Sequence, residues 1–338
     1  MLFCTTHNVP SGKRCRQAEI PFYLSLAFCE GYFFEEKAPQ PLRNHRHRRI
    51  EMNSEIKGIL QVFCAAVIWS VSGVILKSLD VSLAWLLSVR FLCGGVFLSP
   101  FLLKTKIAPY KTLFWTGIAM AVFLLSFSVT TRISSSAMAV SMQYAAPMYV
   151  LGFGFIKYRK IDPSKFLVFI LIAIGVFLNI WDGMKAANIT GVLLGIVIGL
   201  AFLAYSYGMQ NIRQGSLLGI VSLLNFICAA FFLLLLPFDF SPMPTTPSDF
   251  LVIAVSGLLL SGISYALYGA GIRKIKLETA MIVALAEPIL NPLWVYLKMG
   301  IIPSLPVLIG LGFILMGTVV DVAVSFFKKN RLHVQENA

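Results

Sequence analysis

The chain has 338 residues, of which 58% are hydrophobic and only 13% are charged, and its mean hydropathy is +0.81. Soluble globular proteins carry about 25% charged residues, so this composition excludes an ordinary soluble protein. The formal net charge of +13 does not indicate a nucleic-acid partner, because the basic residues stand in short segments between long apolar runs.

The first 51 residues contain no convincing membrane span. Their apolar piece, residues 20–34, is short and interrupted by Glu30, and they end in the basic sequence RNHRHRR. We expect residues 1–53 to form a basic, disordered N-terminal extension. Because Met52 opens directly into the first apolar run, the alternative is that the native chain starts near that residue.

Ten apolar runs follow, each long enough to cross a hydrocarbon core of about 30 Å as a helix. Strand-type alternation is absent, so a membrane barrel is not expected. The sequence therefore predicts an all-α membrane protein, with a tail at residues 328–338. The expected spans are residues 58–77, 82–103, 111–130, 134–156, 165–182, 190–211, 216–237, 250–271, 277–297 and 304–327.

Most of the 28 lysines and arginines lie before the first span, in the even-numbered loops or in the tail. Basic residues concentrate on the cytoplasmic side of a membrane, so both termini are expected there, in a cell (inner) membrane. The exceptions are Lys77, Arg132, Lys185 and Lys298 in odd-numbered loops and Arg90 within a span.

The two halves of the chain resemble each other. The sequence RFLCGGVFL at 90–98 matches NFICAAFFL at 225–233, and Arg132, Pro147 and Lys157 match Arg273, Pro288 and Lys298. We expect one five-helix repeat at residues 54–183 and another at 184–327. Because five is odd, the second repeat is inverted in the membrane, an arrangement typical of secondary transporters with a midplane substrate site.

The ninth span places Glu287 and Pro288 inside an apolar run. A carboxylate at this depth must face protein or water, and Pro288 leaves the carbonyl of Ala284 without a helical donor. Pro147 frees the carbonyl of Gln143 in the same way, so both halves carry a helix break at matching depth. Paired breaks of this kind indicate a transport site, whereas the structural alternative is a buried acid that only fixes helix packing.

Arg90 and Glu287 both lie near the midplane. They either pair with each other, which would be structural, or stand apart and bind a zwitterionic substrate. Asp321 lies closer to a membrane surface and is expected to snorkel or to cap a helix. Aromatic residues within spans are weaker candidates, and among them Trp69 and Tyr205 match between the repeats. The candidate substrate pathway comprises Glu287, Arg90, Gln143, Tyr144, Asn291, Trp69, Tyr205 and Tyr265.

The sequence carries no zinc-ligand spacing, no GxSxG motif, no phosphate-binding loop and no acidic Mg²⁺ cluster. Six scattered cysteines show no disulfide or metal pattern. We therefore expect neither an enzyme nor a bound cofactor or metal. Transport would draw on a gradient of H⁺ or another coupling ion, or on exchange.

These features together resemble the EamA-like members of the drug/metabolite transporter superfamily. The residues that carry the resemblance are Arg90, the Ser- and Ala-rich segment that reaches Pro147, and the sequence Ala286-Glu287-Pro288, and it covers about residues 54–326. It implies a central cavity built from both halves. Lys157 and Lys298 depart from the family, many of whose members place a glutamate there.

The leading hypothesis is a secondary transporter that exports small polar or amphipathic metabolites, such as amino acids, by alternating access. One alternative is uptake or exchange of a nucleotide-type metabolite. Another is a structural or receptor-like membrane protein without transport. The expected partners are the lipid bilayer and a small-molecule substrate, and the sequence leaves open whether the chain is a monomer or a homodimer.

Overall fold

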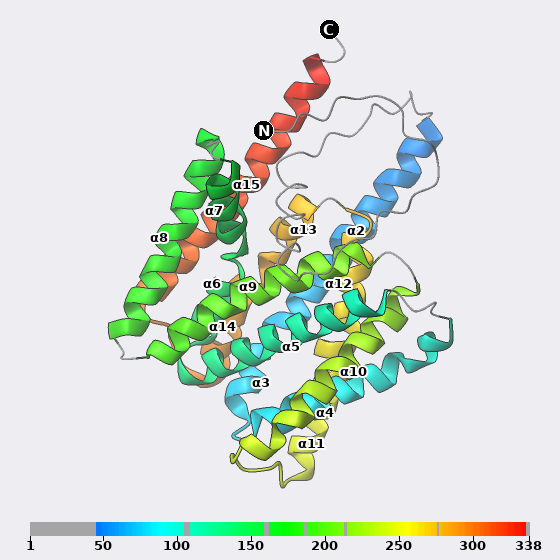
Figure 1. Cartoon of the computed structure of the whole chain (residues 1–338), viewed down its shortest axis with the longest axis vertical. Coiled ribbons are helices and arrows are strands. Elements are labelled where there is room, and N and C mark those ends of the chain that lie inside the picture. The colour runs from blue at the N-terminus through cyan, green and yellow to red at the C-terminus, as the bar shows by residue number, and fades with distance from the viewer. Residues whose placement is uncertain are drawn as a thin grey trace, which may run out of the picture.

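The structure is a computed structural model of the chain, and it describes residues 45–104, 109–158, 162–185, 188–212, 215–275 and 277–335. Within these ranges the chain is helical and contains no strand (Figure 1). Ten stretches there are long and apolar enough to cross a membrane, which confirms the predicted all-α fold with ten spans. They are Ser54–Ser78, Leu83–Leu103, Tyr110–Ile133, Ser136–Lys157, Pro163–Lys185, Ile189–Met209, Leu217–Phe238, Pro247–Ile272, Ile282–Met299 and Leu305–Val324.

Several spans are built from more than one helix. The first five comprise α2 (His45–Ser70) with α3 (Ser72–Ser78), α4 (Leu83–Leu98) with the 3₁₀ turn η1 (Ser99–Lys104), α5 (Tyr110–Ile133), α6 (Ser136–Gln143) with α7 (Ala146–Tyr158), and α8 (Pro163–Lys185). The second five comprise α9 (Ile189–Asn211), α10 (Leu217–Leu235) with the 3₁₀ turn η2 (Leu236–Phe238), α11 (Pro247–Ser256) with the π-helical stretch η3 (Gly257–Ile263) and α12 (Ser264–Ile272), α13 (Leu277–Ala284) with α14 (Ala286–Met299), and α15 (Leu305–Gln335).

Both ends of the described chain are more helical than expected. Helix α2 begins at His45, inside the segment predicted to be disordered, and residues 1–44 lie outside the described residues. Residues 45–57 contain neither proline nor glycine, so the first span can extend as a helix toward its N-terminus. Helix α15 likewise continues to Gln335. The start of α2 and the end of α15 both project from the upper end of the molecule in Figure 1.

The second and seventh spans, which match in sequence, run antiparallel. Ser82, at the start of α4, donates a hydrogen bond to Asp239, which follows the end of η2. At the other end of the contact, Ser222 near the start of α10 donates to the carbonyl of Gly95 late in α4. The fifth and tenth spans also run antiparallel, because Lys165 at the start of α8 pairs with Asp321 late in α15. Repeat-related helices that run antiparallel are what an inverted repeat requires.

The remaining contacts between the halves follow the same exchange of helices. Helix α5 packs on α9, and α2 packs on α12. The helices α5 and α9 belong to the third and sixth spans, whose repeat counterparts are the eighth and first spans. These counterparts contain α12 and α2, so the two contacts are equivalent under the repeat. Both contacts are close: a Cβ added at Gly208 would touch Thr116, and one added at Gly271 would lie 2.6 Å from the side chain of Val62.

The repeat-matched arginines also make matching contacts. Arg132 lies in the last turn of α5 and donates to the carbonyl oxygens of Leu76, Leu79 and Val81, at distances of 3.1, 2.8 and 2.6 Å. Arg273 follows α12 and donates to the carbonyl of Ile212, just after α9, at 3.1 Å. Each arginine therefore ties the end of the third span of its half to the end of the first.

Asp239 caps a helix of the opposite half. Its Oδ2 accepts hydrogen bonds from the hydroxyl of Ser82 at 2.8 Å and from the backbone N–H of Ala84 at 3.0 Å, at the N-terminus of α4. Burial by itself raises the pKa of a carboxyl group. Here the hydrogen bonds from Ala84, Ser241 and Ser82 outweigh burial and lower the pKa of Asp239 to about 2.

Candidate functional site

The fourth and ninth spans are both broken one turn before a proline. Helix α6 ends at Gln143 and α7 begins at Ala146, just before Pro147. Helix α13 ends at Ala284 and α14 begins at Ala286, just before Pro288. Proline lacks the N–H that would continue the helical ladder, and its ring crowds the carbonyl four residues earlier, so the break falls at these points.

The two breaks meet across the boundary between the halves. The hydroxyl of Tyr144 donates to the carbonyl oxygen of Ala284 at 2.7 Å, the acceptor that Pro288 leaves free. The same hydroxyl lies 3.1 Å from Oε2 of Glu287. The side-chain N–H of Gln143 donates to this carboxyl oxygen at 3.3 Å. Gln143 and Tyr144, at the break of the fourth span, therefore hold the carboxyl group of Glu287 in the ninth span.

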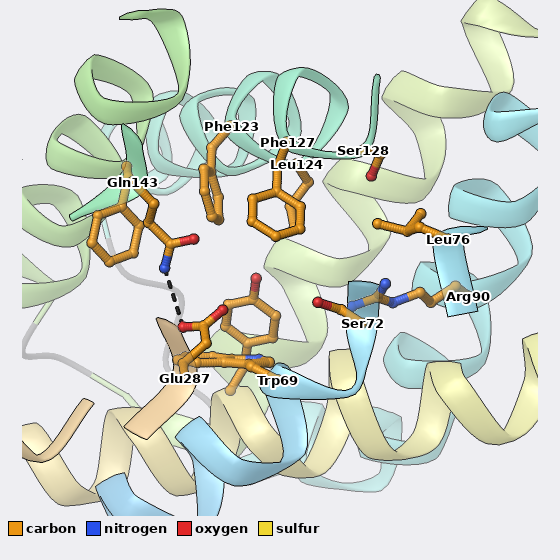
Figure 2. A pocket seen from close by; sticks show the side chains of 12 residues that line it. Trp69, Ser72, Leu76, Arg90, Phe123, Leu124, Phe127, Ser128, Gln143 and Glu287 are labelled. Carbon is orange, nitrogen blue, oxygen red and sulfur yellow. Dashed lines mark hydrogen bonds between the residues drawn. The ribbon is translucent and has the colours of Figure 1, made fainter. Parts of the chain in front are cut away.

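A cavity of about 30 Å³ lies between the two halves. Figure 2 shows Glu287 and Gln143 at one end of the cavity, Arg90 at the other, and Phe123, Leu124 and Phe127 along one wall. A volume of this size holds one or two water molecules. The lining residues are Trp69, Ser72, Leu76, Arg90, Phe123, Leu124, Phe127, Ser128, Gln143, Phe202, Tyr265 and Glu287.

Arg90 and Glu287 stand apart in this cavity. Both side chains are buried, with 3% and 4% of their surface exposed. Among the described residues no ion pair joins them, and Figure 2 shows the guanidinium of Arg90 on the side of Ser72, across the cavity from Glu287. Of the two arrangements considered from the sequence, the structure therefore has the separated one.

The π-helical stretch η3 positions the side chain of Arg90 by a hydrogen bond. The Nε of Arg90 donates to the hydroxyl of Ser261 in η3 at 2.9 Å. Two backbone carbonyls of η3 accept hydrogen bonds from other helices: Leu260 from the indole of Trp69 at 3.2 Å, and Ser261 from the amide of Asn225 at 2.9 Å. A π-helical turn disrupts the regular α-helical ladder, and such turns are frequent at functional sites. Here two carbonyls and one hydroxyl of η3 connect the first, seventh and second spans.

The aromatic residues within the spans form one cluster that includes part of the cavity lining. The ring centroid of Trp69 lies 4.9 Å from that of Tyr265 and 5.1 Å from that of Tyr268. Tyr205 packs edge-on against Tyr265 at 5.9 Å. Trp69 and Tyr265 line the cavity directly, whereas Tyr205 is connected to it through Tyr265.

Five of the eight residues predicted for the substrate pathway line the cavity, and the other three touch its lining. Tyr144 contacts Glu287, Tyr205 contacts Tyr265, and the amide of Asn291 is 3.5 Å from the hydroxyl of Ser72. The sequence reasoning missed the wall contributed by α5 and α9, because neither helix has a break and the charges of α5 lie only at its ends. One signal was present in α5, where Phe123 and Phe127 are one helical turn apart on one face. The missed lining residues are Ser72, Leu76, Phe123, Leu124, Phe127, Ser128 and Phe202.

Asp321 differs from the expectation that it snorkels or caps a helix. It is 1% exposed, and its carboxylate forms an ion pair of 2.7 Å with Lys165 of α8. The side chain of Lys165 is long enough to reach Asp321 inside the neighbouring span. The carboxylate is therefore neutralised by this lysine instead of being exposed to water. No group of three His, Cys, Asp or Glu side chains suited to a metal occurs in the part of the chain that the structure describes.

The sequence matches one transporter family twice, over residues 56–181 and again over residues 185–322. The chain belongs to the EamA-like transporter family. Both matched segments contain one of the two helix breaks and contribute residues to the cavity. Membership in the family, together with ten apolar helices, makes the protein a multi-pass membrane transporter.

Two relatives carry names that agree with a membrane transporter. The uncharacterized inner membrane transporter YicL of Salmonella typhimurium is 27% identical over 289 residues, covering 79% of this chain and 96% of the relative. An uncharacterized transporter of Archaeoglobus fulgidus is 26% identical over 266 residues, covering 78% and 95%. One crystal structure superposes with a TM-score of 0.58 at 18% identity, covering 79% of this chain and 97% of that one, which supports the fold alone.

Proposed function

We propose that this EamA-like protein is a secondary transporter that moves small zwitterionic or amphipathic metabolites, amino acids among them, by alternating access. The observation that carries the proposal is that Glu287 and Arg90 are buried at opposite ends of one cavity. A substrate ammonium group would bind the carboxylate of Glu287, and a substrate carboxylate would bind the guanidinium of Arg90. The apolar wall formed by Phe123 and Phe127 would contact the remainder of the molecule.

The size of the cavity supports alternating access rather than a permanent channel. Its volume of about 30 Å³ is far below the roughly 300–1,000 Å³ of typical ligand sites. The helices must therefore separate for a metabolite to enter. The paired breaks at Tyr144 and Leu285 provide the points at which the fourth and ninth spans can bend.

We further propose that the halves 54–183 and 184–327 are the moving units, that both termini are cytoplasmic and that transport is export from the cell across its inner membrane. The distribution of basic residues supports this orientation. It can be tested by single cysteines in a chain without its six natural cysteines. Ser241→Cys should react with a membrane-impermeant maleimide in intact cells, whereas Ser164→Cys should react only after the membrane is opened. The reverse pattern would contradict the orientation.

Substrate counterflow in proteoliposomes tests the function. Vesicles loaded with one unlabelled amino acid are diluted into the same labelled compound, and the panel also includes nucleotide derivatives and cationic drugs. We expect accumulation of amino acids, and none of their methyl esters or N-acetyl derivatives, because each lacks one of the two charges. If no compound exceeds protein-free vesicles, the proposal is wrong; accumulation of nucleotides alone would favour the alternative substrate class.

The charged pair can be tested in the same assay. Glu287→Gln and Arg90→Met should each lower counterflow at least tenfold, since a charge-assisted hydrogen bond contributes about 1.5–3 kcal/mol. Ser264→Ala is a matched control, because among the described residues this buried hydroxyl donates only to the carbonyl of Leu260 in the same span. Normal elution of each variant in size-exclusion chromatography would show that it is folded. Unchanged counterflow in both charge variants would remove the cavity from the transport path.

A further inference from the structure

Four groups at the helix breaks are joined by three short contacts. The amide nitrogen of Gln143 lies 3.3 Å from Oε2 of Glu287, this oxygen lies 3.1 Å from the hydroxyl of Tyr144, and the hydroxyl lies 2.7 Å from the carbonyl oxygen of Ala284. Each hydrogen bond needs one proton. Gln143 supplies one and the phenol of Tyr144 supplies one, while a carboxylate and a carbonyl supply none.

The single hydroxyl proton of Tyr144 cannot form a full hydrogen bond to both Ala284 and Glu287. Its shorter contact is with Ala284, whose carbonyl has lost its helical donor to Pro288. If the phenol donates there, the 3.1 Å contact with Glu287 has no proton unless the carboxyl group carries one. A protonated Glu287 donates to the oxygen of Tyr144, and every contact is then a normal hydrogen bond.

The surroundings of Glu287 also favour the neutral acid. Its side chain is 4% exposed, and no lysine or arginine in the described ranges lies within ion-pair distance of it. An ionised carboxylate without a cation is costly inside the membrane. The ionisable groups that face it are the phenols of Tyr144, Tyr265 and Tyr268, with the guanidinium of Arg90 across the cavity. Helices α2 and α3 also pack against α14, but their described ionisable residues form no hydrogen bond or ion pair with Glu287: Glu55, Lys57, Cys64 and Lys77.

We infer that Glu287 is a proton-binding site, occupied when the cavity is narrowed as in this structure, and that losing this proton loosens the contact between the two helix breaks. This inference rests on the proposed transport function and assigns H⁺ as its coupling ion. When the proton leaves to cavity water, the Tyr144 hydroxyl turns toward the new carboxylate, because a charged acceptor forms the stronger hydrogen bond. The carbonyl of Ala284 then loses its donor, and the ninth span is freer to bend.

Infrared difference spectroscopy tests the proton without any substrate. Purified protein at neutral pH should show the C=O stretching band of a protonated carboxylic acid, and the band should shift when glutamate is labelled with ¹³C at the side-chain carboxyl. Glu287→Gln should remove it. Tyr144→Phe should shift it in frequency, because the acid loses its acceptor, while Tyr149→Phe and Asp321→Asn should leave it unchanged. Absence of a ¹³C-sensitive acid band in the wild type would overturn the inference, and this reading does not depend on any variant folding.

Amide hydrogen exchange tests the link to the helix break. Corrected for the intrinsic effect of pH, exchange at residues 282–290 should speed up severalfold in the wild type once the acid band disappears at alkaline pH. In Glu287→Gln it should not change over the same range. Equal behaviour of the two proteins would refute the link.

The counterflow assay separates failure of this inference from failure of the proposed function. Counterflow without the acid band would leave a transporter whose Glu287 is ionised, so only the inference would fail. The acid band without counterflow for any compound would retain the proton site and reject the transport function on which its coupling role rests.

Discussion

The hydroxyl of Tyr144 lies 2.7 Å from the backbone carbonyl oxygen of Ala284, so a side chain of the first half satisfies a main-chain acceptor of the second half. Pro288 creates this free acceptor, and the membrane offers no water to satisfy it. Tyr144, at the helix break caused by Pro147, therefore donates to the carbonyl that Pro288 leaves free. It also places the acid of the ninth span against the same hydroxyl.

Replacing Tyr144 by phenylalanine should therefore destabilise the protein. The change leaves the buried carbonyl of Ala284 without a donor, which costs about 1–3 kcal/mol. The free energy of unfolding in detergent, measured with a denaturant, should fall by this amount. Tyr149→Phe is the matched control in the same broken span, because the buried hydroxyl of Tyr149 has no hydrogen-bond partner among the described residues. Equal losses in the two variants would contradict the role of the Tyr144 hydroxyl.

Replacing Ser261 by alanine should weaken substrate binding without unfolding the site. The change frees the Nε of Arg90, which Ser261 holds at 2.9 Å. We expect the KM for substrates with a carboxylate to rise roughly tenfold, in line with the strength of hydrogen bonds to charged groups, while the maximal rate stays similar. Ser261→Thr, which keeps the hydroxyl, should restore the KM. A lower maximal rate at unchanged KM would argue against positioning of Arg90.

Replacing Lys165 by methionine should be strongly destabilising. Lys165 pairs at 2.7 Å with Asp321, whose side chain is 2% exposed, and the variant removes this cation from a buried carboxylate. Breaking a buried pair from one side typically costs about 3–5 kcal/mol. The double variant Lys165→Met and Asp321→Leu should recover most of the loss in free energy of unfolding. Lys185→Met, at the other end of α8, is the control and should change stability little; failure of the double variant to recover would show that the pair itself is not the cause.

Acid should weaken the cap that Asp239 places on α4. The pKa of Asp239 is about 2 in the fold, below its ordinary value of 3.8. Its contribution to stability is thus fully present above the ordinary value and is lost as the pH falls toward about 2. Thermal unfolding midpoints of the wild type and Asp239→Asn should differ at neutral pH and converge as the pH falls through this window. A difference that persists unchanged at the lowest pH would assign the effect to something other than the charge.

The general architecture could be predicted because the bilayer restricts which backbone structures can cross it. Apolar length predicts the spans, and the match of 90–98 with 225–233 predicts that the second half repeats the first. The break at Pro288 could also be predicted, because a missing N–H has a fixed consequence four residues earlier. The antiparallel packing of α4 and α10 agrees with these expectations.

The contacts between distant helices could not be predicted in the same way. The sequence of α5 places Phe123 and Phe127 on one face but does not identify that face as a cavity wall, since an apolar face can contact either lipid or protein. The pairing of Lys165 with Asp321 depends on how α8 packs against α15. The π-helical stretch η3 contains no proline from which it could have been predicted. The structure shows the stretch and the two donors to its carbonyls, Trp69 and Asn225.

The π-helical stretch sets the rotation of the second part of the eighth span. A π turn holds one residue more than an α turn, so winding 257–263 as a regular α-helix of the same length would rotate everything that follows by about 100° relative to α11. Tyr265 and Tyr268 would then turn away from Trp69, and Arg273 away from Ile212. Deleting one residue within α12 would cause a rotation of the same size, whereas the segment 243–246, which carries no regular helix, could absorb a deletion. Insertions and deletions among natural variants of this protein should accordingly collect in that segment and be absent from α12.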